Sequence, residues 1–192
     1  MNIELSAIVM ASGLSQRMGQ DKLRLPFHGK ELFKHIVDLL SQLPFKDKIM
    51  VSSKDYILDY SEKKGFKPVY NECPELGQSV SIRKGLEASS PTKGYMFFVA
   101  DQPFLSKKTI LKLYESFEEN EDQIVLPFFK EQKGNPVIFP QRLKDSLMQI
   151  QGDQGGSVVI KKEWSKTIKI EIPEEKEGID LDTLEKYYEY KE

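Results

Sequence analysis

The sequence has little of several things on which many enzymes and binding proteins depend. It contains one cysteine, Cys73, which excludes an internal disulfide, and two histidines, which leave few ligands for a zinc site. No apolar run approaches the roughly 20 residues that cross a bilayer, so we expect no membrane partner. The segment Met1-Asn2-Ile3-Glu4 has no basic flank and no signal-like stretch, which predicts a cytoplasmic protein.

The sequence also lacks an excess of one charge. Its 28 Lys and Arg residues nearly balance 30 Asp and Glu residues, for a formal net charge of −2 at pH 7. Proteins that bind nucleic acid usually carry a basic excess, so we expect no nucleic-acid partner. Apolar residues are plentiful, at 39% of 192 residues with 11 Phe and 8 Tyr. That supply predicts one folded domain over residues 1–192.

Short β-rich runs alternate along the chain with amphipathic stretches of helical period. We expect strands at residues 5–10, 48–52, 67–70, 95–100, 123–126, 136–139 and 167–172. Helices are expected at residues 31–43, 78–88, 106–120, 141–150, 156–163 and 182–190, with one more ending at Lys64. This alternation predicts an α/β fold with a mostly parallel sheet and helices on both faces.

The loop after the first predicted strand combines small residues with cations. Ligands of such sheets bind beyond the carboxyl ends of the strands, where this loop lies. It contains Ala11, Ser12, Gly13, Ser15, Arg17, Gly19 and Lys22. Glycine lets backbone N–H groups wrap an anion, and the cations add charge-assisted contacts. The spacing fits neither common phosphate motif, so a phosphate loop and an ordinary turn with solvated charges both stay open.

Carboxylates follow two other strands. Asp101 lies directly after the most apolar strand, where one or two carboxylates with substrate phosphates can hold Mg²⁺. Asp180 and Asp182 follow the last strand and offer a second ligand. The alternative for Asp101 is a turn residue. The alternative for Asp182 is a helix N-cap, because Glu185 stands three positions on.

Two further polar regions could contact substrates. Gln78, Ser79 and Ser81 lie at the start of a predicted helix, where amide and hydroxyl groups can read a nucleoside or simply cap the helix. Asn135 and Asp153 lie in glycine-punctuated loops, which suit contact with a second substrate but also occur as ordinary turns.

Taken together and in order, six segments resemble nucleotidyltransferases of the molybdenum cofactor cytidylyltransferase type, in the MobA/MocA-like family. The most specific is Ala-x-Gly-x-Ser-x-Arg-Met-Gly-x-x-Lys, which runs from Ala11 to Lys22. The others are Gly77-Gln78-Ser79-Val80-Ser81-Ile82, Ala100-Asp101-Gln102-Pro103, Gly134-Asn135-Pro136-Val137, Gly152-Asp153 and Ile179-Asp180-Leu181-Asp182-Thr183.

The resemblance implies a three-layer α/β/α Rossmann-like domain and a role for each motif. It implies that the Ala11–Lys22 loop holds the triphosphate and that Gln78, Ser79 and Ser81 lie near the nucleoside. It implies that Asp101 binds Mg²⁺, with Asp180 favoured over Asp182 as the second ligand. Lys22, Arg17 and Asp101 would be the catalytic residues, and Asn135 and Asp153 would contact the acceptor.

The resemblance also bears on the two substrates. The guanylyltransferase branch has two glycines where this chain has Ser12-Gly13, and a Gly-Pro-rich segment at Gly77-Gln78-Ser79, so CTP is favoured over GTP. Ser157 stands where arginine is frequent and Asn135 where histidine is frequent. These departures lie in the acceptor half and bear on the acceptor more than on the nucleotide.

The expected reaction transfers CMP from CTP to the terminal phosphate of molybdenum-bound molybdopterin, with Mg²⁺ as cofactor. A molybdoenzyme or its chaperone is a possible protein partner. Three alternatives stay open: a guanylyltransferase of the same pathway, a nucleotidyltransferase for another phosphorylated small molecule such as a sugar phosphate, and a non-catalytic nucleotide-binding module or chaperone.

Overall fold

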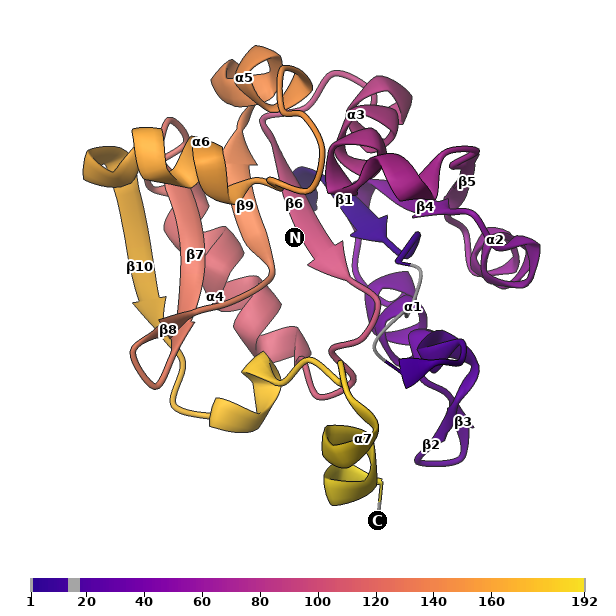
Figure 1. The fold of residues 1–192 in the computed structure, drawn as a ribbon. Helices are drawn as coiled ribbons and strands as arrows, with labels where there is room; N and C mark the ends of the chain where they lie inside the picture. Colours follow the sequence, from indigo (N-terminus) through magenta and orange to yellow (C-terminus); the bar gives the residue numbers. More distant parts are fainter. Residues whose placement is uncertain (1, 14–17, 192) are drawn as a thin grey trace.

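The computed structural model describes residues 2–13 and 18–191, which form a central sheet with helices on both faces (Figure 1). The strands lie in the order β10-β7-β9-β6-β1-β4-β5, with β8 beside β7. Their bounds are Ile3–Met10 (β1), Phe45–Ser52 (β4), Lys67–Tyr70 (β5), Gly94–Val99 (β6), Ile124–Phe129 (β7), Gln132–Lys133 (β8), Val137–Pro140 (β9) and Thr167–Glu171 (β10).

Strand pairing confirms the prediction of a mostly parallel sheet. β1 pairs in parallel with β4, with Ile8 opposite Ile49, and with β6, with Ile8 opposite Phe97. β9 is the exception in the middle of the sheet, since it runs antiparallel to both β6 and β7. The parallel strands β1 and β6 therefore end at the same edge, where a ligand site is expected.

Two apolar cores lie on the two faces of the sheet, and side chains of β1 alternate between them. Leu5, Ala7 and Val9 pack on one side with α1 (Phe33–Ser41), α2 (Asp55–Lys63) and α4 (Lys107–Glu118). Ile8 packs on the other with α3 (Gln78–Ala88), α5 (Lys144–Met148) and α6 (Ser157–Lys162). This alternation follows from the two-residue period of a strand and confirms the three-layer prediction.

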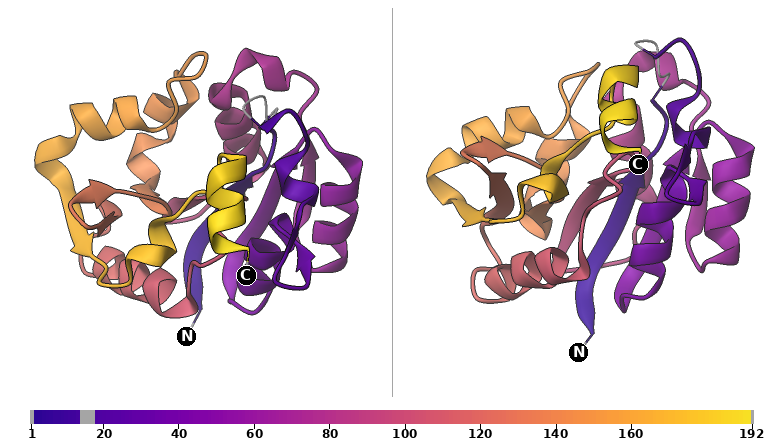
Figure 2. Two further views of the ribbon diagram at one scale, coloured as in Figure 1. Left: turned by 60° about the horizontal axis from the view of Figure 1, so that its bottom comes forward. Right: turned by 90° about the horizontal axis from the view of Figure 1, so that it is seen from below.

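A two-stranded hairpin and the last helix lie beside each other outside these layers (Figure 2). The hairpin consists of β2 (Pro26–Phe27) and β3 (Lys30–Glu31), and the last helix is α7 (Leu184–Tyr190). The Tyr187 hydroxyl donates to the Pro26 carbonyl at 2.6 Å. The sequence pattern did not predict the hairpin and began a helix at Glu31, which instead pairs with Pro26.

Two further helix predictions need correction. The helix expected at residues 141–150 is a 3₁₀ turn, Gln141–Leu143, followed by α5. The cap of α7 is Thr183, whose hydroxyl accepts from the Lys186 N–H at 3.2 Å, and not Asp182. Because Thr183 caps the helix, the Asp182 carboxylate is available to the site described below. No helix in the described part of the chain is long and apolar enough to cross a membrane.

Candidate active site

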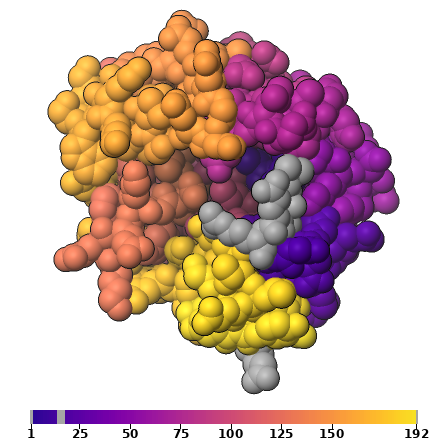
Figure 3. Space-filling view, in the orientation of Figure 1, coloured from indigo at the N-terminus to yellow at the C-terminus, as the bar shows by residue number. Residues whose placement is uncertain are grey.

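A cavity of about 510 Å³ opens beyond the carboxyl ends of β1 and β6. In the space-filling view the surface is hollowed near the centre, between the orange segment around α6 and the yellow C-terminal segment (Figure 3). The predicted site residues that line this cavity are Ala11, Ser12, Gly13, Lys22, Gln78, Ser81, Asp101, Asn135, Asp153, Asp180 and Asp182.

Lys22 connects two carboxylates from distant parts of the chain. It begins the 3₁₀ turn η2 (Lys22–Arg24), and its Nζ donates to Asp101 Oδ2 at 2.5 Å and to Asp182 Oδ1 at 2.6 Å. The Lys22 and Asp101 side chains are only 14% and 13% exposed. The Leu181 N–H donates to the Asp101 carbonyl at 3.1 Å, which fixes the C-terminal segment against the end of β6.

The two carboxylates keep the Lys22 ammonium charged. Burial alone lowers the pKa of Lys22, but the charge of Asp101 and the hydrogen bonds that Lys22 donates to Asp101 and Asp182 outweigh burial and raise the pKa above its ordinary value. Lys22 therefore serves as the internal counter-ion of this edge. A ligand that draws the ammonium away leaves two carboxylates that require another cation.

Asp180 has the opposite electrostatic environment. Its Oδ1 atom is buried and has no hydrogen-bond partner within the described residues. Burial, and next the neighbouring charges of Asp101 and Asp182, raise the pKa of Asp180 to about 7. A carboxylate oxygen that is buried without a donor is costly unless a proton or a cation reaches it.

Asp101 and Asp180 have the donor chemistry for Mg²⁺. This ion prefers oxygen ligands and is commonly held by one or two carboxylates together with substrate phosphates. The described residues contain no cluster of three or more His, Cys, Asp or Glu side chains arranged for a metal. The site therefore fits an ion that takes its remaining ligands from a nucleotide and water, and does not fit a cage built by the protein alone.

Glycines bring the loop around residue 153 against the start of α3. Gly77 has φ +91°, and a Cβ added there would lie 2.5 Å from the Gly152 carbonyl carbon and from Asp153 Oδ1. The Ser79 N–H donates to the Gly152 carbonyl at 3.0 Å. A Cβ at Gly155 would lie 2.6 Å from Gln78 Oε1. The loop of predicted acceptor residue Asp153 thus packs directly on the segment of predicted nucleotide residue Gln78.

Serine hydroxyls form hydrogen bonds at the end of β1 and in the first turn of α3, beside the cavity. Ser12 Oγ donates to the Val51 carbonyl at 3.4 Å, and Ser52 Oγ donates to the Ala11 carbonyl at 3.0 Å. Ser81 Oγ accepts from Asn71 Nδ2 at 3.2 Å, and both residues are buried. These bonds hold the end of β1 and the first turn of α3 in place.

Comparison with known proteins identifies the family of this chain. Residues 7–168 match the MobA-like NTP transferase domain. The chain belongs to this family.

Relatives of this MobA-like chain include a probable molybdenum cofactor guanylyltransferase from Natranaerobius thermophilus. The two are 30% identical over 129 residues, which make up 66% of this chain and 62% of the relative. The chain thus aligns with less than two thirds of the length of that relative.

Solved structures share the fold over nearly the whole chain. A homologue of Mycobacterium tuberculosis rv0371c from Mycobacterium sp. strain JC1 has a TM-score of 0.85 at 21% identity and covers 98% of this chain and 96% of its own. Rv0371c from Mycobacterium tuberculosis H37Rv in complex with manganese has a TM-score of 0.78 at 18% identity, with 97% of each chain covered.

Two described residues among the predictions for this family member do not line the cavity. Ser79 is buried and does not line the cavity, and Gly19 is exposed outside it. Ser15 and Arg17 lie outside the described residues, so their roles stay predictions. Pro74 and Glu75 line the cavity and were missed. The signal that could have found them is their position just before Gly77, in a short turn that opens the α3 segment.

Proposed function

We propose that the chain is a nucleotidyltransferase that moves CMP from CTP to the terminal phosphate of molybdenum-bound molybdopterin and releases pyrophosphate. The observation that carries the proposal is the meeting of Lys22, Asp101 and Asp180 in one cavity beside the Ala11–Gly13 segment. Such transfers need alignment and charge neutralisation at phosphorus, and a cation beside oxygen ligands for a metal supplies both.

The reaction needs no general base from the protein. A phosphate monoester is mostly dianionic at neutral pH, because its second pKa is about 6. One of its oxygens attacks the α-phosphorus of CTP and forms a new P–O bond. The bond from the α-phosphorus to the bridging oxygen breaks, and pyrophosphate leaves with that electron pair.

In this proposal Lys22 moves from its carboxylate partners to the α-phosphate, where it stabilises the charge of the transition state. Asp101 and Asp180 hold Mg²⁺, which supplies charge neutralisation on the phosphates when bound. Asp182, which pairs with Lys22, is the less favoured ligand. Arg17 is proposed for the β- and γ-phosphates, and Asn135 and Asp153 for the acceptor.

The nucleotide substrate has two candidates, CTP and GTP. Ser12 and Gly77-Gln78-Ser79 favour CTP, since these positions differ from the pattern of the guanylyltransferase branch. The relative from Natranaerobius thermophilus is named a guanylyltransferase, which makes GTP the second candidate.

Pyrophosphate release from CTP and GTP, with and without molybdenum-bound molybdopterin, tests these proposals. We expect acceptor-dependent release and a kcat/KM for CTP at least about tenfold above that for GTP. The reverse ratio would identify a guanylyltransferase. Release only with a sugar phosphate would assign another acceptor. Tight nucleotide binding without release would favour a non-catalytic module, or a chaperone for the proposed molybdoenzyme partner.

A further inference from the structure

We infer that Tyr56 and Lys54 are positioning residues for Lys22 and act through the carboxylate of Asp21. This inference rests on the proposed function, because Lys22 is the proposed ligand of the α-phosphate. Neither Tyr56 nor Lys54 lines the cavity, so neither is expected to touch a substrate there.

Asp21 is the residue through which both act. Its Oδ1 accepts from Lys54 Nζ at 2.5 Å and from the Leu23 N–H at 3.3 Å, and its Oδ2 accepts from the Tyr56 hydroxyl at 2.8 Å. Asp21 is the N-cap of the turn that begins with Lys22. A carboxylate held by Tyr56 of α2 and by Lys54, the residue just before α2, therefore fixes the backbone from which the Lys22 side chain extends.

The Tyr56 hydroxyl is itself held by the core. The Tyr56 ring packs edge-on against buried Phe33, with ring centroids 5.6 Å apart. The Arg24 guanidinium carbon also contacts this ring, 4.7 Å from its centroid. Burial, and next the hydrogen bond to Asp21, raise the pKa of Tyr56, so the hydroxyl keeps its proton and stays a donor.

The connection from β4 to α2 contacts the Ala11–Lys22 loop near both of its ends. Ser52 Oγ donates to the Ala11 carbonyl at 3.0 Å and accepts from the Lys54 N–H at 3.2 Å. Lys54 and Tyr56 hold Asp21 at the other end. A misplacement of about 1 Å in a catalytic group can reduce turnover about 100-fold. The two hydrogen bonds to Asp21 are therefore expected to affect the rate of the reaction.

Tyr60 provides a matched control one turn further along α2. Its hydroxyl donates to Asp38 Oδ1 at 2.8 Å, and Asp38 also pairs with Lys30 at 2.6 Å. Its ring likewise packs edge-on against Phe33, with centroids 5.5 Å apart. Asp38 lies within α1, whereas Asp21 caps the turn that begins with Lys22, so the pair repeats the local chemistry of Tyr56 and Asp21 without the link to Lys22.

The test compares Tyr56→Phe with Tyr60→Phe in the full chain. We expect Tyr56→Phe to lower kcat about three- to tenfold at an unchanged nucleotide KM, and Tyr60→Phe to change kcat less than twofold. Amide hydrogen exchange at Leu23 should accelerate in Tyr56→Phe alone. An equal fall in kcat for both variants, or a wild-type kcat in Tyr56→Phe, would overturn the inference.

Lys54 gives a second arm with a conservative rescue. Lys54→Met should lower kcat at least as much as Tyr56→Phe, and Lys54→Arg should restore most of it, because arginine can also donate to Asp21. A wild-type kcat in Lys54→Met would overturn the role of Lys54.

Failure of the proposed function has a different signature. The wild-type protein would then release no pyrophosphate with any nucleotide, and hydrogen exchange alone would decide the inference. Faster exchange at Leu23 in Tyr56→Phe and not in Tyr60→Phe would support the tie to Asp21. Equal exchange in the two variants would overturn it.

Discussion

The two sides of the cavity are held in place by different means. On the proposed nucleotide side, defined by Ala11–Gly13, Lys22 and Asp101, side chains are joined by ion pairs and hydrogen bonds. On the proposed acceptor side, defined by Asn135 and Asp153, no hydrogen bond holds either side chain within the described part of the chain. The backbone is positioned there instead, by close glycine contacts such as that of Gly77 with Gly152.

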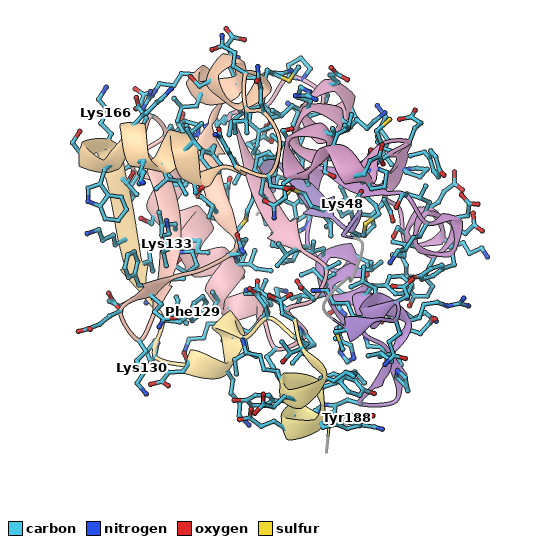
Figure 4. The ribbon with its side chains drawn as sticks, in the orientation of Figure 1. Lys48, Phe129, Lys130, Lys133, Lys166 and Tyr188 are labelled. Atoms are coloured by element: carbon cyan, nitrogen blue, oxygen red, sulfur yellow. The ribbon has the colours of Figure 1, made fainter. Side chains whose placement is uncertain are left out.

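Charge separates the two sides as well. Lys22 is the one cation among the described residues that line the cavity, and it lies on the nucleotide side. The acceptor side carries the Asp153 carboxylate. Lys130 and Lys133 are exposed on the hairpin of β7 and β8 and do not line the cavity, and Lys130 pairs with Glu175 (Figure 4). Ion pairs therefore organise the nucleotide side, whereas shape and backbone contacts organise the acceptor side.

Loss of the built-in cation should have the largest effect. We expect Lys22→Met to lower pyrophosphate release about 10²- to 10³-fold, because charge at the α-phosphorus is no longer stabilised. The same variant should bind Mn²⁺ more tightly without nucleotide, since the ammonium no longer competes for Asp101. Lys30→Met, which loses a pair with Asp38 far from the cavity, is the control. Turnover within fivefold of wild type would remove Lys22 from the reaction.

Crowding at Gly77 should produce the next largest effect, because the two sides meet there. We expect Gly77→Ala to lower the free energy of unfolding by about 2 kcal/mol or more, since the added Cβ meets backbone at a positive φ. Urea denaturation measures the loss.

Gly65→Ala is the matched control for Gly77→Ala, because Gly65 has φ +83° and nothing within 4 Å of its added Cβ. Gly65→Ala should lower the free energy of unfolding by about 1 kcal/mol and leave pyrophosphate release unchanged. Equal losses in the two variants would show that the contact between Gly77 and Gly152 contributes nothing.

The ionisation of Asp180 should make stability depend on pH. Its pKa is about 7 in the folded protein and near 3.8 when unfolded. The folded state therefore binds this proton more tightly than the unfolded state does. The contribution of Asp180 to the free energy of unfolding falls as pH rises from about 4 to about 7. Asp180→Asn lacks this loss, so without metal its free energy of unfolding should exceed that of wild type by a few kcal/mol at pH 8.

Urea denaturation at pH 5 and pH 8, with and without Mg²⁺, measures this difference. The excess of the free energy of unfolding of Asp180→Asn over that of wild type should be larger at pH 8 than at pH 5. Mg²⁺ should stabilise wild type more than the variant at pH 8. An advantage that does not change with pH would contradict the raised pKa of Asp180.

Changes on the acceptor side should have the smallest effect. We expect Asn135→Ala and Asp153→Asn to raise the acceptor KM about three- to tenfold while the nucleotide Kd stays unchanged, because each removes one polar contact. Steady-state kinetics and nucleotide titration separate the two constants. A weaker nucleotide Kd in both variants would show that the two sides are not independent.

Local sequence patterns predicted the parts that depend on neighbouring residues. The strand expected at residues 95–100 and the helix expected at residues 106–120 follow from apolar character and helical period, and both are confirmed, as β6 and as α4 with Ser106 at its cap. The β2–β3 hairpin was missed, because strands of two residues carry almost no periodic signal and this pair is stabilised by contact with α7. Asp182 was weighed as a cap because Glu185 stands three positions on, but the cap of α7 is Thr183.

The sequence by itself determined the fold class and the order in which loops with glycine, cations and carboxylates follow the strands. Both depend on short-range periodicity and on residue chemistry. Only the tertiary structure decided that Lys22 pairs with Asp101 and Asp182, that Asp180 is buried without a donor for one oxygen, and that Tyr56 reaches Asp21. These contacts join residues 35 to 160 positions apart, and the pKa values that follow depend on burial, which no local pattern encodes.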